Sequence, residues 1–546
     1  MSTITGRNAL VSGKTSRYEF VAGGMIAVSA LLFALGVASL FEFVTLTDPI
    51  AGLPTVTVLG GLLVVIGGGV IGLGGASRLE LIETTPDRSA GLVAAGVFGS
   101  LWFGIGSVVG TELLGIGGSG GLVPGLLLGG GAFAVTVLTR EDISSTVPAG
   151  VLAIFAGAVF LAGVLGPGWS WSPGSFPSDN AVTFFPSVVV PGSVLLCSLL
   201  VGWASAKAYA GFGARGRHLG AHVLIYLNAL AIIAVLFGLV GFVVSKGAPT
   251  AFTGFTIGLG VGPEVTALGV SFSLPVSWPF LMNGASVFVK IDGILPAVVG
   301  TVWLVIGAVL FAVPLAVGAA VFLAEYADEG RFTSVVEVAT NGLWSTPSIV
   351  FGLFGASFLI PRFGGSKSLI AGMLTLGFML LPLVLITSRE AMLAVPDGYR
   401  DASAALGVSK WQTIRSVVLP AALPGIVTGV ILGVGRIAGE TAPILVTMAG
   451  GTLPAGSETI DVIGGFEFIS TPPFVTNEAL LEASSALPYQ LYALITAGLG
   501  GPQFEDAPFS ALDFAWANAF VLLTVVLSFY AIGIATRYYF RRKLNR

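Results

Sequence analysis

Long, continuous apolar stretches recur along almost the whole chain, and they limit the possible fold more than any other feature. Of the 546 residues, 55% are hydrophobic and only 10% are charged. A soluble protein of this length needs a larger share of polar residues to cover its surface. Because the apolar stretches are continuous rather than alternating, they favour membrane-spanning helices over a β-barrel. The sequence therefore predicts an all-α polytopic membrane protein.

The length of these stretches sets the expected number of spans. A membrane helix needs about 20 apolar residues to cross a hydrocarbon core of about 30 Å, which gives about 12 transmembrane helices in two groups of about six. The expected spans lie near 18–44, 54–76, 90–112, 121–138, 147–166 and 188–206 in the first group, and near 221–246, 294–324, 338–360, 369–388, 422–450 and 515–537 in the second.

The two groups are not clear repeats of one another, because the polar stretch near residue 400 has no counterpart in the first group. We therefore expect an appended N-terminal helical membrane domain at 1–210, with about six transmembrane helices, and a second membrane domain at 211–546. The sequence does not indicate the role of 1–210. Membrane packing or contact with a partner is its simplest interpretation.

The distribution of positive charge predicts the orientation in the membrane. Lysine and arginine gather before the first expected helix, after the second and the fourth, between the two groups and at the C-terminus. Such loops stay in the cytoplasm, so we expect both termini and the segment near residue 400 on that side. The loop at 451–514 has acidic residues but neither lysine nor arginine and belongs outside, while Arg362 and Lys367 are exceptions to the rule.

The polar stretch near residue 400 is built to bend. Residues 401–420 read DASAALGVSKWQTIRSVVLP and lie between two strongly apolar segments. We expect two short helices, at 398–406 and 408–418, joined at Gly407, because glycine adopts backbone conformations that permit such a turn.

The second of these short helices is amphipathic. Trp411, Ile414, Val417 and Val418 fall on one apolar face, whereas the basic residues of the segment lie elsewhere. Such a helix pair can pack one face on the membrane helices and present the other to a soluble partner. A surface amphipathic helix without a partner is the alternative interpretation.

A second polar motif lies inside an apolar stretch, at 433–443, which reads GVGRIAGETAP. Gly425, Gly429 and Gly433 recur every fourth residue and predict a face for close helix packing. Arg436 and Glu440 share another face, and each charge costs about 2.5–3.5 kcal/mol at the bilayer centre, so neither should face lipid. Two interpretations stay open: an ion pair that locks the helix bundle, or a path lining in which the Arg436 guanidinium handles an oxyanion.

The segment at 401–420 resembles the EAA loop of ABC-importer permeases, whose pattern is E-A-A-x3-G-x9-I-x-L-P. Gly407, Leu419 and Pro420 fit this pattern. Asp401 replaces the glutamate, Ser403 the second alanine and Val417 the isoleucine, while Ala402 fits.

The motif Gly439–Pro443 resembles the GETAP signature of PstA-type phosphate ABC-transporter permeases. Other segments agree in the same order: GILP at 293–296 ahead of Gly300-Thr301, LAEY at 323–326, TPSIVFG at 346–352 and LPYQLY at 487–492. The resemblance covers about residues 215–546 and does not extend to 1–210.

The resemblance implies a type I ABC-importer fold for the last six helices and a transmembrane permease domain with a cytoplasmic coupling loop at 391–420. The chain would be a cell-membrane permease subunit that translocates inorganic phosphate by alternating access. Residues in contact with the ATPase would be Asp401, Ala402, Ser403, Gly407, Trp411, Leu419 and Pro420. Residues of the translocation path would be Arg436, Glu440 and Thr441.

The same resemblance implies the partners. They are a pair of ATP-binding subunits, a second related permease subunit and an external phosphate-binding protein, besides the lipid bilayer. With one cysteine and two histidines, we expect no metal site, and no cofactor, since ATP is bound and hydrolysed by the partner. The chain itself is then not an enzyme, and no basic groove suggests nucleic acid.

Two other functions stay open at this point. The first is a permease for another oxyanion, such as sulfate, molybdate or tungstate. The second is a secondary transporter that uses ion gradients, with the N-terminal helices as one half of an inverted repeat.

Overall fold

The computed structural model describes residues 17–166, 168–172, 183–267, 270–286, 290–291, 293–328, 330–449, 460–472, 474–498 and 509–544. Arg7 and Lys14 of the basic N-terminal segment, and 451–459 and 499–508 of the acidic loop, lie outside the described residues. The chain divides into two compact units, Met1–Phe242 and Val243–Arg546. The boundary predicted at 210 lies just before helix α7 (Gly213–Ala251), whereas the contact-based division falls within that helix.

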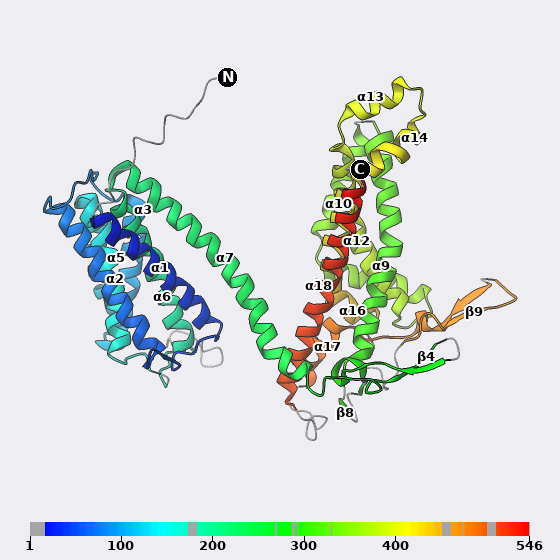
Figure 1. The fold of residues 1–546 in the computed structure, drawn as a ribbon, viewed down its shortest axis with the longest axis horizontal. Coiled ribbons are helices and arrows are strands. Elements are labelled where there is room, and N and C mark those ends of the chain that lie inside the picture. Colours follow the sequence, from blue (N-terminus) through cyan, green and yellow to red (C-terminus); the bar gives the residue numbers. More distant parts are fainter. Residues whose placement is uncertain are drawn as a thin grey trace. The chain divides into compact units, whose positions relative to one another are not determined.

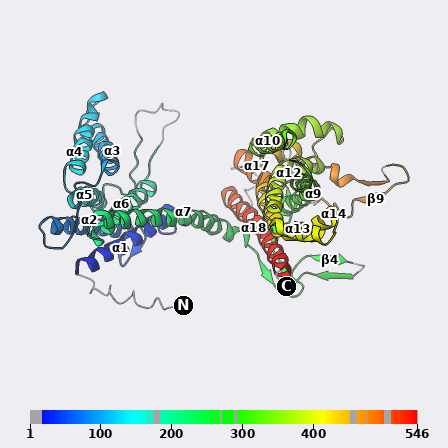
Figure 2. The ribbon, with the colours of Figure 1, turned by 90° about the horizontal axis from the view of Figure 1, so that it is seen from above.

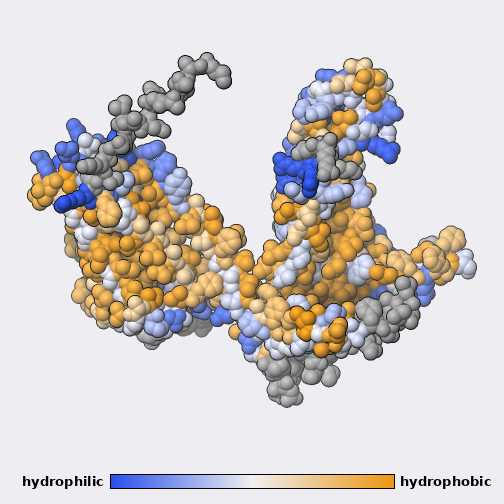
Figure 3. Space-filling model, viewed as in Figure 1, coloured by the Kyte–Doolittle hydropathy of each residue, from blue (hydrophilic) through white to orange (hydrophobic). Residues whose placement is uncertain are grey.

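Helices long and apolar enough to cross a membrane number 11 in the described part of the chain, or up to 12 if one bent pair is a single span. This confirms the prediction of an all-α polytopic membrane protein with about 12 spans. Hydrophobic residues cover the sides of the helices in each unit, and hydrophilic residues gather toward the helix ends (Figure 3).

The first unit is a bundle of helices. They are α1 (Arg17–Leu40), α2 (Thr55–Arg78), α3 (Leu92–Val108), α4 (Leu122–Leu138), α5 (Glu141–Leu161), α6 (Pro186–Tyr209) and the start of α7, with a hairpin of β1 (Pro49–Ile50) and β2 (Leu53–Pro54), a π-turn (Val109–Leu113) and a 3-10 turn (Gly118–Gly121). Glycines set the distance between α2 and α5, since a Cβ on Gly67 would lie 2.7 Å from the Gly150 carbonyl oxygen. This is the close backbone approach that small residues permit in membranes.

A buried charge network ties one end of this unit together. Lys207 Nζ lies 2.8 Å from Glu141 Oε1, and both side chains are almost fully buried. Glu141 Oε2 accepts hydrogen bonds from the backbone N–H groups of Asp87 (2.9 Å) and Gly213 (2.8 Å). A paired and hydrogen-bonded charge of this kind is tolerated in the interior, and its partners here come from the α2–α3 loop, α6 and the start of α7.

The second unit contains the polar motifs. Its helices are α8 (Pro279–Met282), α9 (Leu295–Val321), α10 (Arg331–Ser345), α11 (Ser348–Phe354), α12 (Leu369–Leu393), α13 (Asp397–Ala405), α14 (Lys410–Thr413), α15 (Leu419–Ala438), α16 (Ala442–Thr447), α17 (Leu487–Ala493) and α18 (Ala511–Leu544). Its π-turns are Phe322–Tyr326, Gly355–Leu359, Ile414–Val418 and Leu494–Gly498, and its 3-10 turns are Ile360–Arg362 and Glu478–Leu481.

Antiparallel two-stranded sheets complete this unit. They pair β3 (Thr256–Ile257) with β6 (Val276–Ser277), β4 (Glu264–Ala267) with β5 (Val270–Ser273), β7 (Ala285–Ser286) with β8 (Lys290–Ile291), and β9 (Phe466–Phe468) with β10 (Val475–Asn477). Within the unit, β4, β8 and β9 lie at one end, while α13, α14 and the C-terminal end of α18 lie at the other (Figure 1).

Helix α12 is the centre of the second unit. It packs against α9 and α15, and Leu376, Leu380 and Val384 along it belong to the main hydrophobic core. The predicted glycine face of α15 is confirmed, since a Cβ on Gly425 would lie 2.6 Å from Ala391 Cβ, and one on Gly429 would clash with Thr387. A Cβ on Gly433 would likewise clash with Leu380, so all three glycines face α12.

Two of the predicted spans are not continuous helices. The span predicted at 338–360 consists of Arg331–Ser345 and Ser348–Arg362, which meet at an angle of 101°. The span predicted at 422–450 is wrong as one helix, because α15 ends at Ala438 and α16 begins at Ala442. In each case a proline, Pro347 or Pro443, lies at the start of the second piece, where its missing N–H and fixed φ favour a new helix start over continuation.

Candidate coupling and translocation site

The segment predicted to bend does so at Gly407. Its φ is +71°, in the left-handed region that glycine adopts without strain. The Val408 N–H donates to the Ser403 carbonyl (3.1 Å) and the Gly407 N–H to the Ala404 carbonyl (2.9 Å). These two bonds form a Schellman motif, which satisfies the last carbonyls of α13 and turns the chain.

A capping box starts the next helix. The Ser409 side chain accepts from the Gln412 N–H, and the Gln412 side chain accepts from the Ser409 N–H. Helix α14 then continues through a π-turn into α15, so that the loop and the membrane helix form one connected element. Such a connection can transmit a displacement of the loop to the membrane helix.

The apolar face predicted for this helix is only partly correct. Ile414 and Val418 are buried and pack beneath the loop, as expected. Trp411, in contrast, is 57% exposed. It lies in the first turn after the capping box, before the helix reaches the membrane helices on which Ile414 and Val418 pack.

The tip of the loop presents apolar side chains to its surroundings. Leu406 is 83% exposed, and Tyr399 and Trp411 are each 57% exposed. Figures 1 and 2 show α13 and α14 together at the end of the second unit. Large exposed apolar side chains on neighbouring helices are typical of a protein-binding site.

The other predicted coupling residues lie around this surface. Asp401 and Ala402 are exposed on α13, whereas Ser403 is buried and its hydroxyl donates to the Tyr399 carbonyl at 3.0 Å. Leu419 and Pro420 are half-buried at the start of α15.

An arginine that the sequence analysis missed anchors α13. Arg400 Nη2 lies 2.7 Å and its Nε 3.2 Å from Glu325 Oε1, while Arg400 also donates to the Val395 (2.7 Å) and Met392 (3.0 Å) carbonyls. These bonds to Glu325 raise the pKa of Arg400 above its ordinary value. The arginine thus fixes α13 to the π-turn at Phe322–Tyr326, which follows α9. The sequence shows both Glu325, within LAEY at 323–326, and Arg400. It does not show that these two residues, 75 positions apart, form a pair.

The predicted path residues meet at the break between α15 and α16. Arg436 lies in the last turn of α15, with its Nε 3.9 Å from Glu440 Oε1. Its guanidinium carbon stacks 4.3 Å from the centre of the Trp344 ring, at the end of α10. Thr441 occupies the break itself, and its carbonyl accepts from the Leu445 N–H at 3.0 Å. Trp344 is a further residue that the sequence did not single out.

The two helix breaks are neighbours in space. Helices α11 and α16 pack together, and a Cβ on Gly352 would lie 3.0 Å from Pro443 Cα. The Arg436 side chain is still 35% exposed and that of Glu440 19% exposed. Charged groups in a membrane helix avoid lipid, so this face borders a polar space or a partner. Discontinuous helices that meet at such a site are a recurrent way to bind ions and substrates within membranes.

A small polar pocket of about 300 Å³ lies between α10 and α12. Arg389 Nη2 is 2.7 Å from Glu337 Oε1, and Thr340, Asn341 and Glu390 complete the polar lining of the pocket. Asn341 and Trp344 are three residues apart on α10 and therefore share a face of that helix. The pocket and the Arg436 site thus lie along one helix, and the Arg389–Glu337 pair was not predicted from the sequence.

Two motifs far apart in the sequence also meet. The Leu487 N–H donates to Thr301 Oγ1 at 2.9 Å, and this bond is fully buried. It docks the start of α17, in LPYQLY at 487–492, on α9 beside Gly300, where a Cβ would clash with the Ser485 carbonyl.

The chain is similar to several known proteins. Residues 312–497 match the family described as "Binding-protein-dependent transport system inner membrane component". The chain is 33% identical over 252 residues to the phosphate transport system permease protein PstA of Haemophilus influenzae, covering 46% of this chain and 77% of that relative. It is 40% identical over 169 residues to PstA 1 of Mycobacterium tuberculosis, covering 31% of this chain and 55% of the relative.

The probable ABC transporter permease protein YqgI of Bacillus subtilis is 36% identical over 179 residues, covering 33% of this chain and 60% of the relative. Among solved structures, the chain is similar to one from the inward-facing MetNI methionine ABC transporter, with 19% identity and a TM-score of 0.32, covering 44% of this chain and 93% of that one. The extent of the match to the Haemophilus relative decides the family. The chain belongs to the PstA-type family of ABC transporter permeases.

Proposed function

We propose that this chain is the permease subunit of an ATP-driven importer that moves inorganic phosphate across the cell membrane by alternating access. The observation that carries the proposal is Arg436 at the junction of two broken helices, in a chain of the PstA-type family. Its guanidinium has five N–H donors in a planar fork that matches an oxyanion.

The geometry around Arg436 suits transient binding. At 3.9 Å, the contact with Glu440 is too long for a strong hydrogen bond, so donors of Arg436 remain available to an anion. Trp344 holds the guanidinium by stacking, which leaves the edge of the group free. Glu440 opposes an anion held at Arg436 and would favour its release rather than tight binding. Thr441 adds a hydroxyl next to this pair.

The loop at 391–420 is the proposed contact with a pair of ATP-binding subunits. Its exposed Leu406, Tyr399 and Trp411 supply the apolar surface, and the Arg400–Glu325 pair supplies the rigid connection to α9. Closure of the ATPase subunits would then move α9 and α15 together and alternate the access of the Arg436 site between the two sides of the membrane.

The remaining partners follow from the same proposal. A second related permease would cover the partly exposed faces of α10 and α15 beside Arg436, and an external phosphate-binding protein would deliver the substrate. The C-terminus would lie in the cytoplasm, which is supported by the common position of α13, α14 and the end of α18 in the second unit (Figure 1). The N-terminus would lie on the same side, as the lysine and arginine residues at the start of the sequence predict. Residues 1–210 would be an appended membrane domain that packs in the bilayer.

The test uses cells that depend on this transporter, with phosphate and sulfate uptake measured side by side. Arg436→Ala should lower phosphate uptake by about 100-fold or more, because it removes the only proposed charge that favours the anion. Arg436→Lys keeps the charge but not the planar fork, and should retain part of the uptake. Normal uptake by an assembled Arg436→Ala complex, or equal transport of sulfate, would contradict the proposal.

A further inference from the structure

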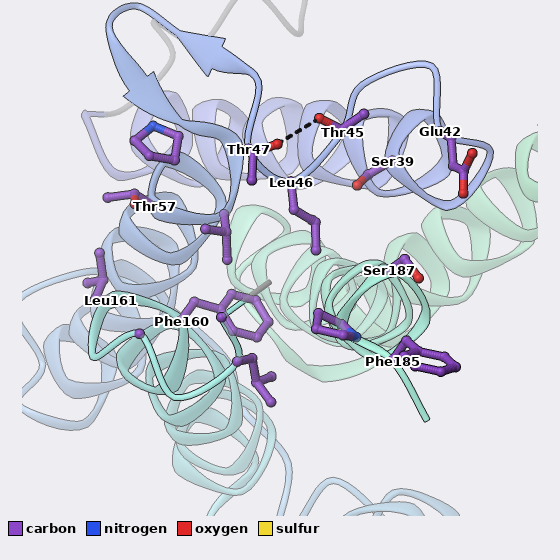
Figure 4. A pocket seen from close by; sticks show the side chains of 16 residues that line it. Ser39, Glu42, Thr45, Leu46, Thr47, Thr57, Phe160, Leu161, Phe185 and Ser187 are labelled. Carbon is purple, nitrogen blue, oxygen red and sulfur yellow. Dashed lines mark hydrogen bonds between the residues drawn. The ribbon is translucent and has the colours of Figure 1, made fainter. Parts of the chain in front are cut away.

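Two pockets of the described chain differ in the charge of their lining. The larger, of about 650 Å³, lies in the first unit, where Ser39, Phe160 and Phe185 line it (Figure 4). None of its lining residues is an arginine, lysine or histidine. The smaller, of about 300 Å³, lies between α10 and α12 in the second unit and is lined by Arg389. Of the two, only the smaller offers a positive charge to an anion.

The pocket with Arg389 lies on the coupling-loop side of Arg436. Arg389 falls in the last two turns of α12, just before the loop, whereas Arg436 falls in the last turn of α15, away from the loop at which that helix begins. Leu323 of the π-turn after α9 also lines the pocket, two residues from the Glu325 that binds Arg400 of α13. The pocket is therefore next to the elements that the coupling loop would move.

One face of α10 leads from Arg436 to this pocket. Glu337, Asn341 and Trp344 are four and then three residues apart, so they share that face. Trp344 stacks on the Arg436 guanidinium, while Glu337 and Asn341 line the pocket. The seven residues from Glu337 to Trp344 span about 10 Å of helix. An anion that left Arg436 on this side would reach the pocket next along α10.

The ion pair of Arg389 leaves half of its donor fork unused. Nη2 lies 2.7 Å from Glu337 Oε1, whereas Nη1 is 3.8 Å from Glu390 Oε1, too far for a hydrogen bond. The Nε atom is buried and has no hydrogen-bond partner among the described residues. A buried donor without a partner is uncommon and needs an explanation. Nε and Nη2 lie side by side on the guanidinium and together fit two oxygens of an oxyanion.

The Arg400–Glu325 pair of the same unit shows what a saturated pair looks like. There Nε and Nη2 both donate to the carboxylate, at 3.2 and 2.7 Å, and the Glu325 side chain is only 6% exposed. The Glu337 side chain is 43% exposed and uses one of the two donor positions on Arg389. A pair open to water contributes little stability, because water and salt screen it. An oxyanion that fills both positions on Arg389 can therefore displace Glu337.

The rest of the lining favours brief binding. Asn341 supplies an amide with two N–H donors, while the exposed Glu337 and Glu390 supply carboxylates. These two carboxylates outnumber the single guanidinium, so they oppose an anion that stays in the pocket. A site for an ion in transit needs this balance between entry and release.

We propose that Arg389 forms a second binding site for the transported anion, which takes phosphate after it leaves Arg436 and releases it on the coupling-loop side. Glu337 pairs with Arg389 when no anion is bound and turns toward solvent when phosphate fills the Nε–Nη2 edge. The inference rests on the proposed function, because it concerns the same phosphate on the same path.

The first test measures equilibrium binding of radiolabelled inorganic phosphate to the purified complex in nanodiscs. The Arg436→Ala background is used, so that Arg389 is the remaining proposed site. Adding Glu337→Gln should tighten phosphate binding about tenfold, because the competing carboxylate is removed and the positive charge stays. Adding Arg389→Gln should weaken it by about tenfold or more. A purely structural link between α10 and α12 would be broken equally by both substitutions, so changes in the same direction, or no change, overturn the proposal.

Uptake by the complex in vesicles tests release from the second site. With Arg436 intact, Arg389→Gln and Glu337→Gln should each lower kcat for phosphate about tenfold and leave kcat/KM unchanged, because capture precedes this site. Arg331→Gln is the matched control with wild-type kinetics expected, since Arg331 is an exposed arginine of α10 that does not line the pocket. Thermal unfolding of each variant checks folding.

The outcomes separate this inference from the proposed function. Phosphate uptake with wild-type kcat in Arg389→Gln overturns the second site and leaves the proposed function intact. A wild-type complex that accumulates no phosphate contradicts the proposed function, and this inference with it.

Discussion

Arg436 carries a full charge near the end of a membrane helix, and its surroundings explain how the fold tolerates it. The guanidinium stacks on Trp344 at 4.3 Å and lies 3.9 Å from Glu440. Because Arg436 is 35% exposed, its cation–π contact is worth about 0.5–1 kcal/mol and offsets only part of the cost of about 2.5–3.5 kcal/mol for a charge at the bilayer centre. The two interpretations of this pair, a structural lock and an anion contact, are therefore compatible, because stacking fixes the arginine without consuming its donors.

The contribution of the Arg400–Glu325 pair to stability can be tested by substitution. Arg400→Gln leaves Glu325, whose side chain is only 6% exposed, without its countercharge. Removing one partner of a fully buried pair costs about 3–5 kcal/mol, and we expect a smaller loss here because Arg400 is 22% exposed. The Glu325→Gln, Arg400→Gln double variant should recover part of that loss, as read by thermal unfolding in detergent. Additive losses from the two single variants would exclude a direct pair.

The pH dependence of this contact has a definite sign. Glu325 raises the pKa of Arg400 above the ordinary arginine value. A raised folded-state pKa gives stability that is fully present below the unfolded pKa and is lost only as the pH rises through the folded value. The stability that Arg400 contributes should therefore stay constant through the neutral range.

At the scale of elements, helix packing could be read from glycine spacing. Gly425, Gly429 and Gly433 predicted a close face, and all three lie against α12. The breaks before α11 and α16 were not predicted, because long apolar segments flank the short polar stretches at Pro347 and Pro443 on both sides. Only the backbone chemistry of proline and its neighbours, within an otherwise apolar stretch, marks them.

Gly429→Ala tests this packing. A Cβ at Gly429 clashes with Thr387, so we expect α15 and α12 to separate slightly at a cost of about 1–3 kcal/mol. Gly318→Ala in α9 is the matched control, since nothing lies within 4 Å of its added Cβ. Alanine is favoured over glycine in a helix by about 0.5–1 kcal/mol, so the control should be neutral or slightly stabilising. Thermal unfolding that moves both variants in the same direction would contradict the packing described here.

Gly407→Val tests the coupling bend. The positive φ of Gly407 is strained for a β-branched residue, so α13 and α14 should lose their fixed angle. We expect ATP-driven uptake to fall by about tenfold or more while ATP hydrolysis and membrane insertion persist. Gly398→Ala is the control, because its φ is not positive and its added Cβ meets no atom within 4 Å. Full uptake by Gly407→Val would show that coupling does not require the bend at Gly407.

The sequence predicted the local features of the site better than the long-range ones. The bend at Gly407 and the i,i+4 relation of Arg436 and Glu440 follow from neighbouring residues, and both are present. The partners Glu325 and Trp344 come from other helices, and a single sequence does not reveal which helices meet. The exposure of Trp411 was also unpredictable, because helical periodicity gives a face but not where the supporting helices end.

At the scale of the whole molecule, the chain joins a permease unit to a second helical unit. The family match at 312–497 lies entirely within Val243–Arg546, so the first unit is an addition to the matched region. Its buried Lys207–Glu141 pair and close glycine contacts give it a core of its own.

The central claim is that a motor on another polypeptide drives an anion past Arg436. The most direct measurement is phosphate accumulation in vesicles that contain the purified complex, with ATP on the side of the ATPase subunits. We predict accumulation that requires ATP and the ATPase subunits, and that stops in Arg436→Ala although ATP is still bound. Accumulation in vesicles that lack the ATPase subunits, driven by an ion gradient alone, would contradict the account.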